Sequence, residues 1–292
     1  DTMTIDCDKE PFKVENGTWQ DENLYDLYKK AYTPWDWQAE LKEEAQKIGI
    51  DFFSTPYENT AVDFLEDLGV DFYKVASFSV TNIPFLKYLA KQGKPIIMST
   101  GLATLGEIEK AVKTIREQGN DQLALLKCSS AYPAVPEDMN LKNMNHLAET
   151  FDVPTGLSDH TLGSVSAVAA TARGANIIEK HFCISREIEN PDASFSMEPD
   201  EFAEMVDNIR TAEKAVGEID YSLSEREKTS RVFRRSIFVV EDIKEGEEFC
   251  KDNLRVIRPG NGLKPKHYSQ IVGKRATEDI ERGTPLEWGL VR

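Results

Sequence analysis

The sequence predicts an α/β protein with a (β/α)8 TIM barrel that lacks its first two βα units, followed by a small β-rich domain. Two observations lead to this prediction. Six short apolar segments begin 21 to 32 residues apart and alternate with helical stretches, as parallel strands covered by helices do. After Gly217 this alternation stops, and short strands punctuated by glycines replace it.

The predicted strands of the barrel are short, mainly apolar runs. They are Ile50–Pro56, Asp71–Ser77, Pro95–Gly101, Leu123–Ser130, Thr155–Thr161 and Asn176–Phe182. The helices expected between and after them are Glu58–Leu68, Ile83–Gln92, Leu105–Gln118, Leu141–Thr150, Ser164–Arg173 and Pro199–Val216. Within the third helix, Ile108, Ala111, Val112 and Ile115 recur at helical spacing and form one apolar face.

A closed barrel needs eight such units, and the sequence offers six. The segment before Ile50 is expected to be an irregular loop, Asp1–Asn23, and one helix, Pro34–Ile48. Either roughly 50 residues that form the first two units are absent, or the sheet is open. A doubly wound sheet also fits the alternation, but it usually carries a glycine-rich phosphate turn after its first strand, which this sequence lacks.

The C-terminal part has a different sequence pattern from the barrel. We expect domain boundaries at 1–217 for the barrel, 218–233 for a charged linker and 234–292 for the β-rich domain. Its predicted strands are Ser236–Val240, Leu254–Pro259 and Ile271–Ala276. A domain of this size is near the lower limit for independent folding, so we expect it to pack on another surface.

Composition narrows the function classes. The 292 residues contain 35 Lys and Arg against 51 Asp and Glu, a formal charge of −16. A chain this acidic repels phosphate backbones and anionic lipids, which disfavours nucleic-acid and membrane partners. No apolar run approaches a membrane span, and the acidic first ten residues do not resemble a signal peptide. Four scattered cysteines without a CxxC motif indicate free thiols in a reducing cytoplasm.

Polar residues end each predicted strand, where a TIM barrel carries its chemistry. These residues are Ser54-Thr55, Ser77, Ser99-Thr100, Ser129-Ser130, Ser158-Asp159-His160 and Lys180-His181. His160 and His181 occupy matching positions on consecutive strands, which would aim both imidazoles into one barrel mouth and suit a divalent metal. The alternative is that both histidines are structural.

Lys74 lies among apolar strand residues, so it must either extend to solvent or pair with an anion. Together with Thr55, Ser77, Ser99 and Ser158 it would form a phosphate or carboxylate cradle. The alternatives are a lysine at a strand edge and serines that cap helices; Ser99-Thr100-Gly101 precedes a predicted helix closely enough to cap it. Arg258, in the turn Arg258–Gly262, is either a site residue or part of a tight loop.

Several motifs resemble those of one enzyme family. They are FFSTP (Phe52–Pro56), YKVAS (Tyr73–Ser77), STG (Ser99–Gly101), CSSAYP (Cys128–Pro133), GLSDHTLG (Gly156–Gly163), IIEKHF (Ile177–Phe182), NPDASFSMEPDEF (Asn190–Phe202) and RPGNGL (Arg258–Leu263). In this order they resemble the sialic-acid-type nonulosonate synthases. DTMTIDCD (Asp1–Asp8) and LYDLYKKAYTPWDW (Leu24–Trp37) point to the pseudaminic acid synthase branch.

The resemblance implies a truncated barrel, a C-terminal antifreeze-like (SAF) domain, and a domain-swapped homodimer in which each small domain caps the partner's barrel. It implies that phosphoenolpyruvate condenses with an acetamido sugar, here a 2,4-diacetamido-2,4,6-trideoxy hexose, to give pseudaminic acid and phosphate. By similarity, His160 and His181 bind a divalent metal, Mn²⁺ or Mg²⁺. Phosphoenolpyruvate would be held by Lys74, Thr55, Ser77, Ser99, Ser130 and Ser158. The sugar would be faced by Tyr132, Asp192 and Arg258, with Arg258 reaching across the dimer.

The sequence departs from the family pattern in two places. The family's first two strands, which carry a glutamate near the metal and a lysine for phosphoenolpyruvate, are absent. Ser79 stands where many members have a sugar-contacting glutamate, so it marks a specificity position. These departures leave three alternatives: an N-acetylneuraminate synthase that uses N-acetylmannosamine, a non-catalytic sugar- or phosphate-binding relative, and a metal-dependent aldolase on the same fold.

Overall fold

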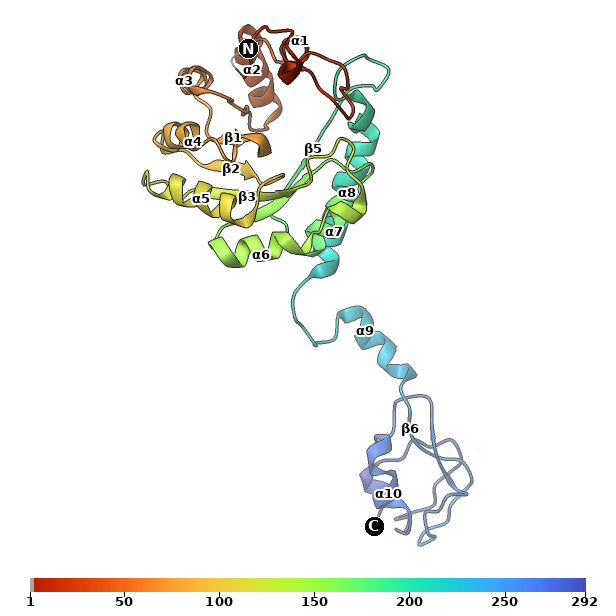
Figure 1. The fold of residues 1–292 in the computed structure, drawn as a ribbon. Helices are drawn as coiled ribbons and strands as arrows, with labels where there is room; N and C mark the ends of the chain where they lie inside the picture. The colour runs from red at the N-terminus through yellow and green to blue at the C-terminus, as the bar shows by residue number, and fades with distance from the viewer. Residues whose placement is uncertain (1–2) are drawn as a thin grey trace. The chain divides into compact units, whose positions relative to one another are not determined.

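A computed structural model describes residues 3–292 of the chain, so the first two residues of the DTMTIDCD motif lie outside the described residues. The chain divides into two compact units, Asp1–Gly217 and Glu218–Arg292. Unit 1 contains a five-stranded parallel sheet in the order β1-β2-β3-β4-β5. Figure 1 shows its helices arranged around the outside of these strands. The sheet is therefore the partial barrel that the sequence predicts.

The elements of unit 1 follow the expected alternation. Its strands are β1 (Tyr73–Val75), β2 (Ile96–Ser99), β3 (Leu123–Cys128), β4 (Thr155–Asp159) and β5 (Ile177–Lys180). Its helices are α1 (Leu24–Ala31), α2 (Gln38–Ile48), α3 (Asn59–Leu68), α4 (Ile83–Ala90), α5 (Leu105–Arg116), α6 (Lys142–Phe151), α7 (Val165–Ala172) and α8 (Pro199–Val216). The main core lies between β1–β3 and helices α3–α6.

The prediction of a first strand at Ile50–Pro56 is wrong. No residue of this segment belongs to a strand, and one backbone bond, from the Lys74 N–H to the Ser54 carbonyl at 3.5 Å, links it to β1. A strand needs a continuous ladder on at least one side. Within the described residues, no other strand pairs with this segment, so apolar composition alone was a misleading signal.

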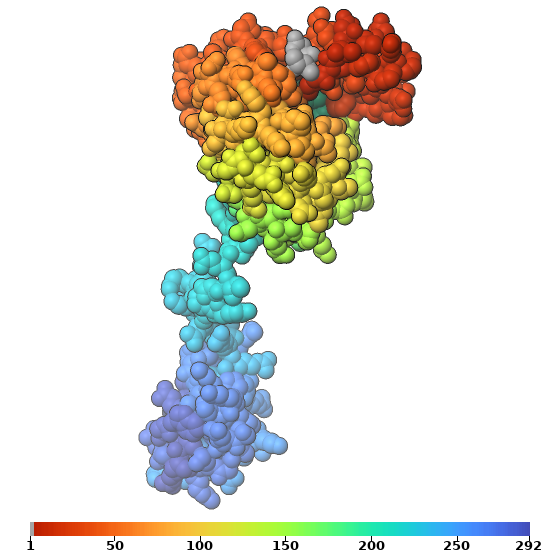
Figure 2. All heavy atoms as spheres, turned by 60° about the vertical axis from the view of Figure 1, so that its left-hand side comes forward, coloured from red at the N-terminus to blue at the C-terminus, as the bar shows by residue number. Residues whose placement is uncertain are grey.

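The N-terminal segment contains a helix that the sequence pattern did not predict. Helix α1 begins after Asn23, whose side chain accepts a hydrogen bond from the Tyr25 N–H. Helix α2 follows a 3-10 turn at Trp35–Trp37 within the predicted range Pro34–Ile48. Figure 2 shows this red N-terminal part forming the surface at one end of unit 1.

The close approach of β4 and β5 requires a glycine. A Cβ on Gly156 would lie 2.1 Å from the Ile177 carbonyl oxygen. Gly156 pairs with Ile177, and the register continues to Asp159 opposite Lys180. The next residue along each strand is a histidine, so this register places His160 and His181 side by side.

Unit 2 begins with α9 (Glu225–Thr229), which buries no residue; an antiparallel pair β6 (Ser236–Val239) and β7 (Leu254–Ile257) and helix α10 (Tyr268–Ile271) then contribute to its own apolar core. Helix α9 lies within the segment expected to be a linker, and Ser224 caps it. The predicted strand Ile271–Ala276 is wrong. Ile271 ends α10, and Gly273 adopts a left-handed φ of 90°, which interrupts extended backbone; only isolated bridges follow, at Arg275 and Ala276.

Candidate active site

The two predicted metal ligands meet at the carboxyl ends of β4 and β5. The imidazole centroids of His160 and His181 lie 5.2 Å apart at an interplanar angle of 63°. His160 is buried, with 5% of its surface exposed, whereas His181 is about one-third exposed. Two imidazoles at this separation can bind one ion between them.

The hydrogen bonds of both histidines favour metal binding through Nε2. His160 Nδ1 lies 2.8 Å from the Ser129 carbonyl oxygen, and since a carbonyl can only accept, we assign the proton to Nδ1. His181 Nδ1 lies 3.3 Å from Asp192 Oδ2. A metal-binding histidine usually donates its other ring N–H to a carbonyl or carboxylate, so this donor arrangement fits a divalent metal. Within residues 3–292, no cluster of three or more His, Cys, Asp or Glu is arranged as a complete site.

Aromatic rings and acidic groups surround the histidine pair. The Tyr132 ring lies 4.2 Å from the His160 ring and 6.0 Å from the His181 ring, and Phe195 lies 5.0 Å from His181. Burial raises the pKa of Tyr132, and the nearby Cys128, Tyr57, Asp192 and Glu179 raise it further. The acidic groups among these neighbours give the site a negative potential, which attracts a cation.

Lys74 does not reach solvent but joins a network that crosses the inner face of the sheet. Its Nζ donates to Ser99 Oγ at 2.8 Å and lies 3.4 Å from Glu179 Oε2. Glu179 Oε1 accepts a hydrogen bond of 2.6 Å from the Ser158 hydroxyl. Ser99 therefore does not cap the following helix; Thr104 caps α5. The network brings together residues from β1, β2, β4 and β5.

A second polar cluster surrounds Gly101, directly after β2. Its N–H donates to Ser77 Oγ at 3.0 Å. A Cβ on Gly101 would lie 2.2 Å from Ser130 Oγ, 2.9 Å from Ser77 Oγ and 3.2 Å from Cys128 Sγ. Glycine is needed because a Cβ does not fit among these side chains, and the Ser77 and Ser130 hydroxyls that meet here can donate to an anion.

Cys128 lies between the polar cluster around Gly101 and the histidine pair. Its Sγ lies 3.8 Å from Ser130 Oγ and 3.9 Å from His160 Nδ1. Burial alone raises the pKa of this thiol, but its interactions with His160, Ser77 and Ser130 outweigh burial and lower the pKa to about 7. Conversely, burial lowers the pKa of His160, while Cys128 and the Ser129 carbonyl raise it above its ordinary value.

The remaining predicted residues differ in position. Thr55 is half-buried before α3, and among the described residues its side chain makes no hydrogen bond. Ser79 is buried in the 3-10 turn Ser77–Ser79 after β1. Arg258 lies in unit 2, directly after β7. The structure thus groups the histidines, Tyr132, Asp192, Lys74, Ser77, Ser99, Ser130 and Ser158 in unit 1.

Three residues of the site were not predicted from the sequence, namely Glu179, Trp19 and Thr18. Glu179 holds both Lys74 and Ser158, and its position two residues before His181 on the same strand was the available signal. Trp19 packs on Tyr132 at 5.3 Å and on Phe195 at 6.3 Å, and its indole N–H donates to the Pro191 carbonyl at 3.0 Å. Thr18 also donates to the Tyr132 carbonyl, so the predicted N-terminal loop helps to enclose the site.

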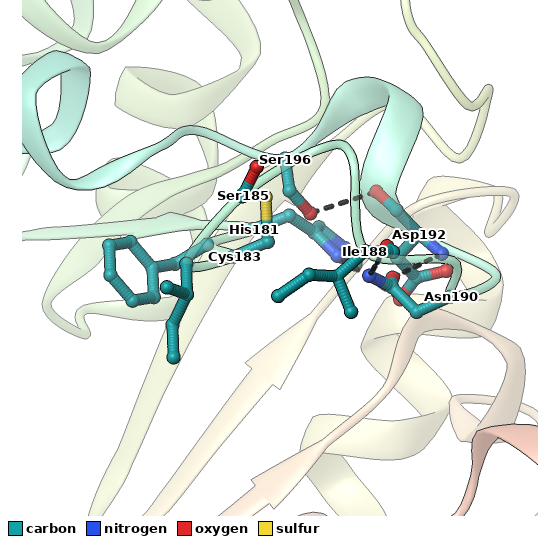
Figure 3. Close-up of a pocket in the computed structure, with 9 residues that line it drawn as sticks. His181, Cys183, Ser185, Ile188, Asn190, Asp192 and Ser196 are labelled. Carbon is teal, nitrogen blue, oxygen red and sulfur yellow. Dashed lines mark hydrogen bonds and ion pairs between the residues drawn. The ribbon is translucent and has the colours of Figure 1, made fainter.

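An open pocket of about 320 Å³ adjoins His181. Figure 3 shows Asp192 and Asn190 beside the imidazole, with Ile188 on the same loop. Asn190 Oδ1 accepts from the Asp192 N–H at 3.0 Å, and the Ser196 hydroxyl donates to the Asp192 carbonyl at 2.8 Å. These bonds fix the backbone of Asp192 and thereby hold its carboxylate toward His181.

Comparison with protein families identifies both units. Residues 1–221 match the NeuB family, and residues 234–292 match the SAF domain. The protein belongs to the NeuB family. None of its described helices has the length and apolar character needed to cross a bilayer.

Individual relatives agree with the family assignment. The chain is 44% identical to the pseudaminic acid synthase of Campylobacter jejuni over 98% of its own length and 84% of the relative's. It is 41% identical to the pseudaminic acid synthase of Helicobacter pylori, covering 97% of this chain and 84% of that one. The spore coat polysaccharide biosynthesis protein SpsE of Bacillus subtilis has a similar crystal structure, with a TM-score of 0.61 and 32% identity over 96% of this chain and 83% of that one. The fold and family predicted from the motifs are confirmed.

Proposed function

We propose that this protein condenses phosphoenolpyruvate with a 2,4-diacetamido-2,4,6-trideoxy hexose to form pseudaminic acid and phosphate. The similarity to pseudaminic acid synthases, 41–44% over nearly the whole chain, supports this reaction. The observation that carries the proposal is that a histidine pair and a buried lysine network share one end of one sheet. A cation site beside an anion site is what this condensation requires.

Phosphoenolpyruvate occupies the anion half of the site. Lys74 provides a buried positive charge, pre-oriented by Ser99 and Glu179. The Gly101 N–H with Ser77 and Ser130 provides further donors, and Ser158 completes the set from β4. We place Thr55 at the periphery of this cradle, as the family resemblance implies. Fixed donors stabilise the phosphate and carboxylate despite the acidic chain.

The sugar occupies the cation half. His160 and His181 would hold a divalent ion, Mn²⁺ or Mg²⁺, through Nε2, and the bound ion would act as a Lewis acid toward the sugar aldehyde. Tyr132 covers the two imidazoles and forms an apolar wall, while Asp192 orients His181 and can accept a sugar hydroxyl proton in a hydrogen bond.

The bond changes balance without an additional reactant beyond water. Carbon 3 of phosphoenolpyruvate forms a bond to the sugar's aldehyde carbon, and the aldehyde oxygen takes up a proton. Water adds to carbon 2, which has become electron-deficient: its hydroxyl bonds to carbon 2, and one proton goes to the former aldehyde oxygen. The C–O bond to the phosphate then breaks as the carbon 2 hydroxyl becomes the ketone of the product and its proton passes to the phosphate. Lys74 and the hydroxyl donors stay with the phosphate throughout, so their role is to bind the leaving group as its charge develops.

We further propose a homodimer in which a second copy covers this end of the sheet and contributes Arg258 to the sugar's acetamido group. Exposed apolar side chains follow all five strands, namely Phe78, Leu102, Val135, Leu162, Phe182 and Ile184. An apolar rim of this kind is typical of a protein interface. We also assign the reaction to the cytoplasm, because all four cysteines are free thiols.

The test is phosphate release by the complete gene product. Phosphoenolpyruvate is supplied with and without manganese, and the diacetamido sugar and N-acetylmannosamine are offered in parallel. Manganese-dependent release with the diacetamido sugar alone is the expected result. Release with N-acetylmannosamine alone would contradict the sugar assignment and make Ser79 compatible with a sialic acid synthase. Tight phosphoenolpyruvate binding with no release from either sugar would favour a non-catalytic relative, and pyruvate release from the product without phosphate would favour an aldolase.

A further inference from the structure

A fully buried ion pair lies directly behind the two histidines. Lys180 Nζ and Asp159 Oδ2 are 2.8 Å apart, and the exposed fractions of the two side chains are 1% and 0%. The ammonium group also donates to the carbonyls of Thr161 and Gly163. The other carboxylate oxygen, Oδ1, accepts from the Thr161 N–H at 2.9 Å and the Thr161 hydroxyl at 2.7 Å. Every strong donor and acceptor of the pair therefore has a partner.

The pair belongs to the two neighbouring strands that carry His160 and His181. Asp159 and Lys180 are register partners in β4 and β5, and each immediately precedes one of the histidines. Because side chains alternate along a strand, the ion pair lies on the face opposite the imidazoles. Lys180 thus ties the end of β5 to the turn after β4.

The backbone of His160 is fixed from both sides. Before it, Asp159 is paired with Lys180; after it, the Thr161 N–H and hydroxyl bond back to Asp159. The carbonyl of His160 itself accepts from the Ala134 N–H at 2.9 Å. On β5, the His181 carbonyl accepts from the Met197 N–H at 2.9 Å. The ion pair is one of two side-chain links between the ends of β4 and β5; the other, from Ser158 to Glu179, lies one residue earlier and on the face of the imidazoles.

Stability alone is a weak explanation for this pair. Taking two charges out of water has a desolvation cost that their attraction barely offsets, and apolar replacements of buried ion pairs are often neutral or stabilising. What such a pair does provide is a single geometry, because a partly satisfied network in the interior is strongly disfavoured.

We propose that Asp159 and Lys180 are positioning residues that set the separation of His160 and His181 and thereby the affinity for the divalent ion. This inference rests on the metal assignment in the proposed function. Partners that orient metal ligands without touching the metal typically contribute 10- to 100-fold to metal affinity. Because this pair acts through the backbone, we expect an effect near the lower limit, about tenfold.

The experiment titrates Mn²⁺ into the apo form of the complete gene product and measures its dissociation constant. Asp159→Asn keeps an oxygen for Thr161 but leaves Lys180 without a counter-charge. Lys180→Met leaves Asp159 without one. The double variant D159N/K180M removes both charges, so it should regain much of the thermal stability that the single variants lose. We expect its manganese dissociation constant to stay about tenfold above that of the wild type.

The matched control is Asn120→Ala. Asn120 is buried and donates to the Lys94 carbonyl at 2.8 Å, at the opposite end of the sheet. This variant should lose stability and keep wild-type manganese affinity, which separates positioning from general loosening of the fold.

The other possible outcomes would contradict either the inference or the proposed function. Wild-type manganese affinity in the double variant would overturn the inference and leave the pair a structural feature. Equal losses of affinity in the double variant and in Asn120→Ala would also overturn it. A wild-type protein without any manganese site would overturn both the inference and the metal assignment. Intact manganese binding without phosphate release would contradict only the proposed reaction.

Discussion

The two edges of the five-stranded sheet are built differently. At one edge, all three residues of β1 are buried, yet the covering segment at 50–56 contributes one backbone bond. At the other edge, the four residues of β5 are partly exposed as whole residues, although the Lys180 side chain itself is buried. Strand β5 pairs with β4 along its full length, as β1 does with β2, and the Asp159–Lys180 ion pair adds a side-chain link that β1 lacks. The edge with less burial carries Glu179 and His181. The buried edge carries Lys74, so site residues occur at both edges; what they share is a strand in full register and a place in the polar network, whatever the depth of burial.

The largest expected effect comes from breaking the β4–β5 edge. In Gly156→Ala, the added Cβ would lie 2.1 Å from the Ile177 carbonyl oxygen. Because this contact is with backbone, neither strand can move away without a large energetic cost. We expect a loss of more than about 3 kcal/mol of folding free energy, or no soluble folded protein. Chemical denaturation measures it. Gly106→Ala is the control, because a Cβ there meets nothing within 4 Å. Equal stability of the two variants would contradict the tight β4–β5 contact.

The next largest effect should come from the network that joins the two edges. Lys74→Met removes the buried charge that contacts Ser99 and Glu179. We expect phosphoenolpyruvate to bind about 10- to 100-fold more weakly, the range for a hydrogen bond to a charged group. Calorimetric titration with phosphoenolpyruvate measures the change. Lys94→Met is the control, because Lys94 pairs with Glu66 and does not contact the network. A similar loss in both variants would argue against a specific role for Lys74.

A smaller effect is expected at the polar cluster around Gly101, after β2. Gly101→Ala places a methyl group against Ser130, Ser77 and Cys128. The serine side chains can rotate away, so we expect stability to fall by about 1–3 kcal/mol and phosphoenolpyruvate affinity to fall about tenfold. Denaturation and ligand titration give the two values. Unchanged phosphoenolpyruvate affinity would contradict a role for the Gly101 cluster in binding the anion.

The smallest effect should occur at the edge with one backbone bond. Thr55 makes no hydrogen bond among the described residues, whereas Ser99 contacts Lys74. Thr55→Ala should therefore change phosphoenolpyruvate affinity less than about threefold, and Ser99→Ala should weaken it about tenfold. The reverse order would show that register is a poor guide to which residues hold the ligand.

Strand pairing also explains which elements could be predicted from the sequence. Helix α8 was predicted with its observed bounds because Pro199 and Gly217 mark its two ends. Segments 50–56 and 271–276 were both predicted as strands from apolar composition. One makes a single bond to β1, and the other contains the end of α10 and the left-handed Gly273. Pairing partners decide what is a strand, and a local pattern does not contain them.

Site residues were predictable where alternation along a strand placed them. His160 and His181 follow β4 and β5 in register, so one pattern located both. Trp19 was missed because it reaches the site from a loop far away in sequence, where no periodicity points to Tyr132. Helix α1 was not predicted although Asn23 caps it; it is eight residues long and buries only Leu27, so it presents little apolar surface to the core.

The most direct test of the account is a manganese titration followed by electron paramagnetic resonance. It compares the wild type with His160→Ala, His181→Ala and His146→Ala, the last a control with an exposed histidine on α6. We predict one manganese site in the wild type and in His146→Ala, and none in the other two variants. Manganese bound with wild-type affinity after loss of either His160 or His181 would contradict the proposal that β4 and β5 together form the metal site.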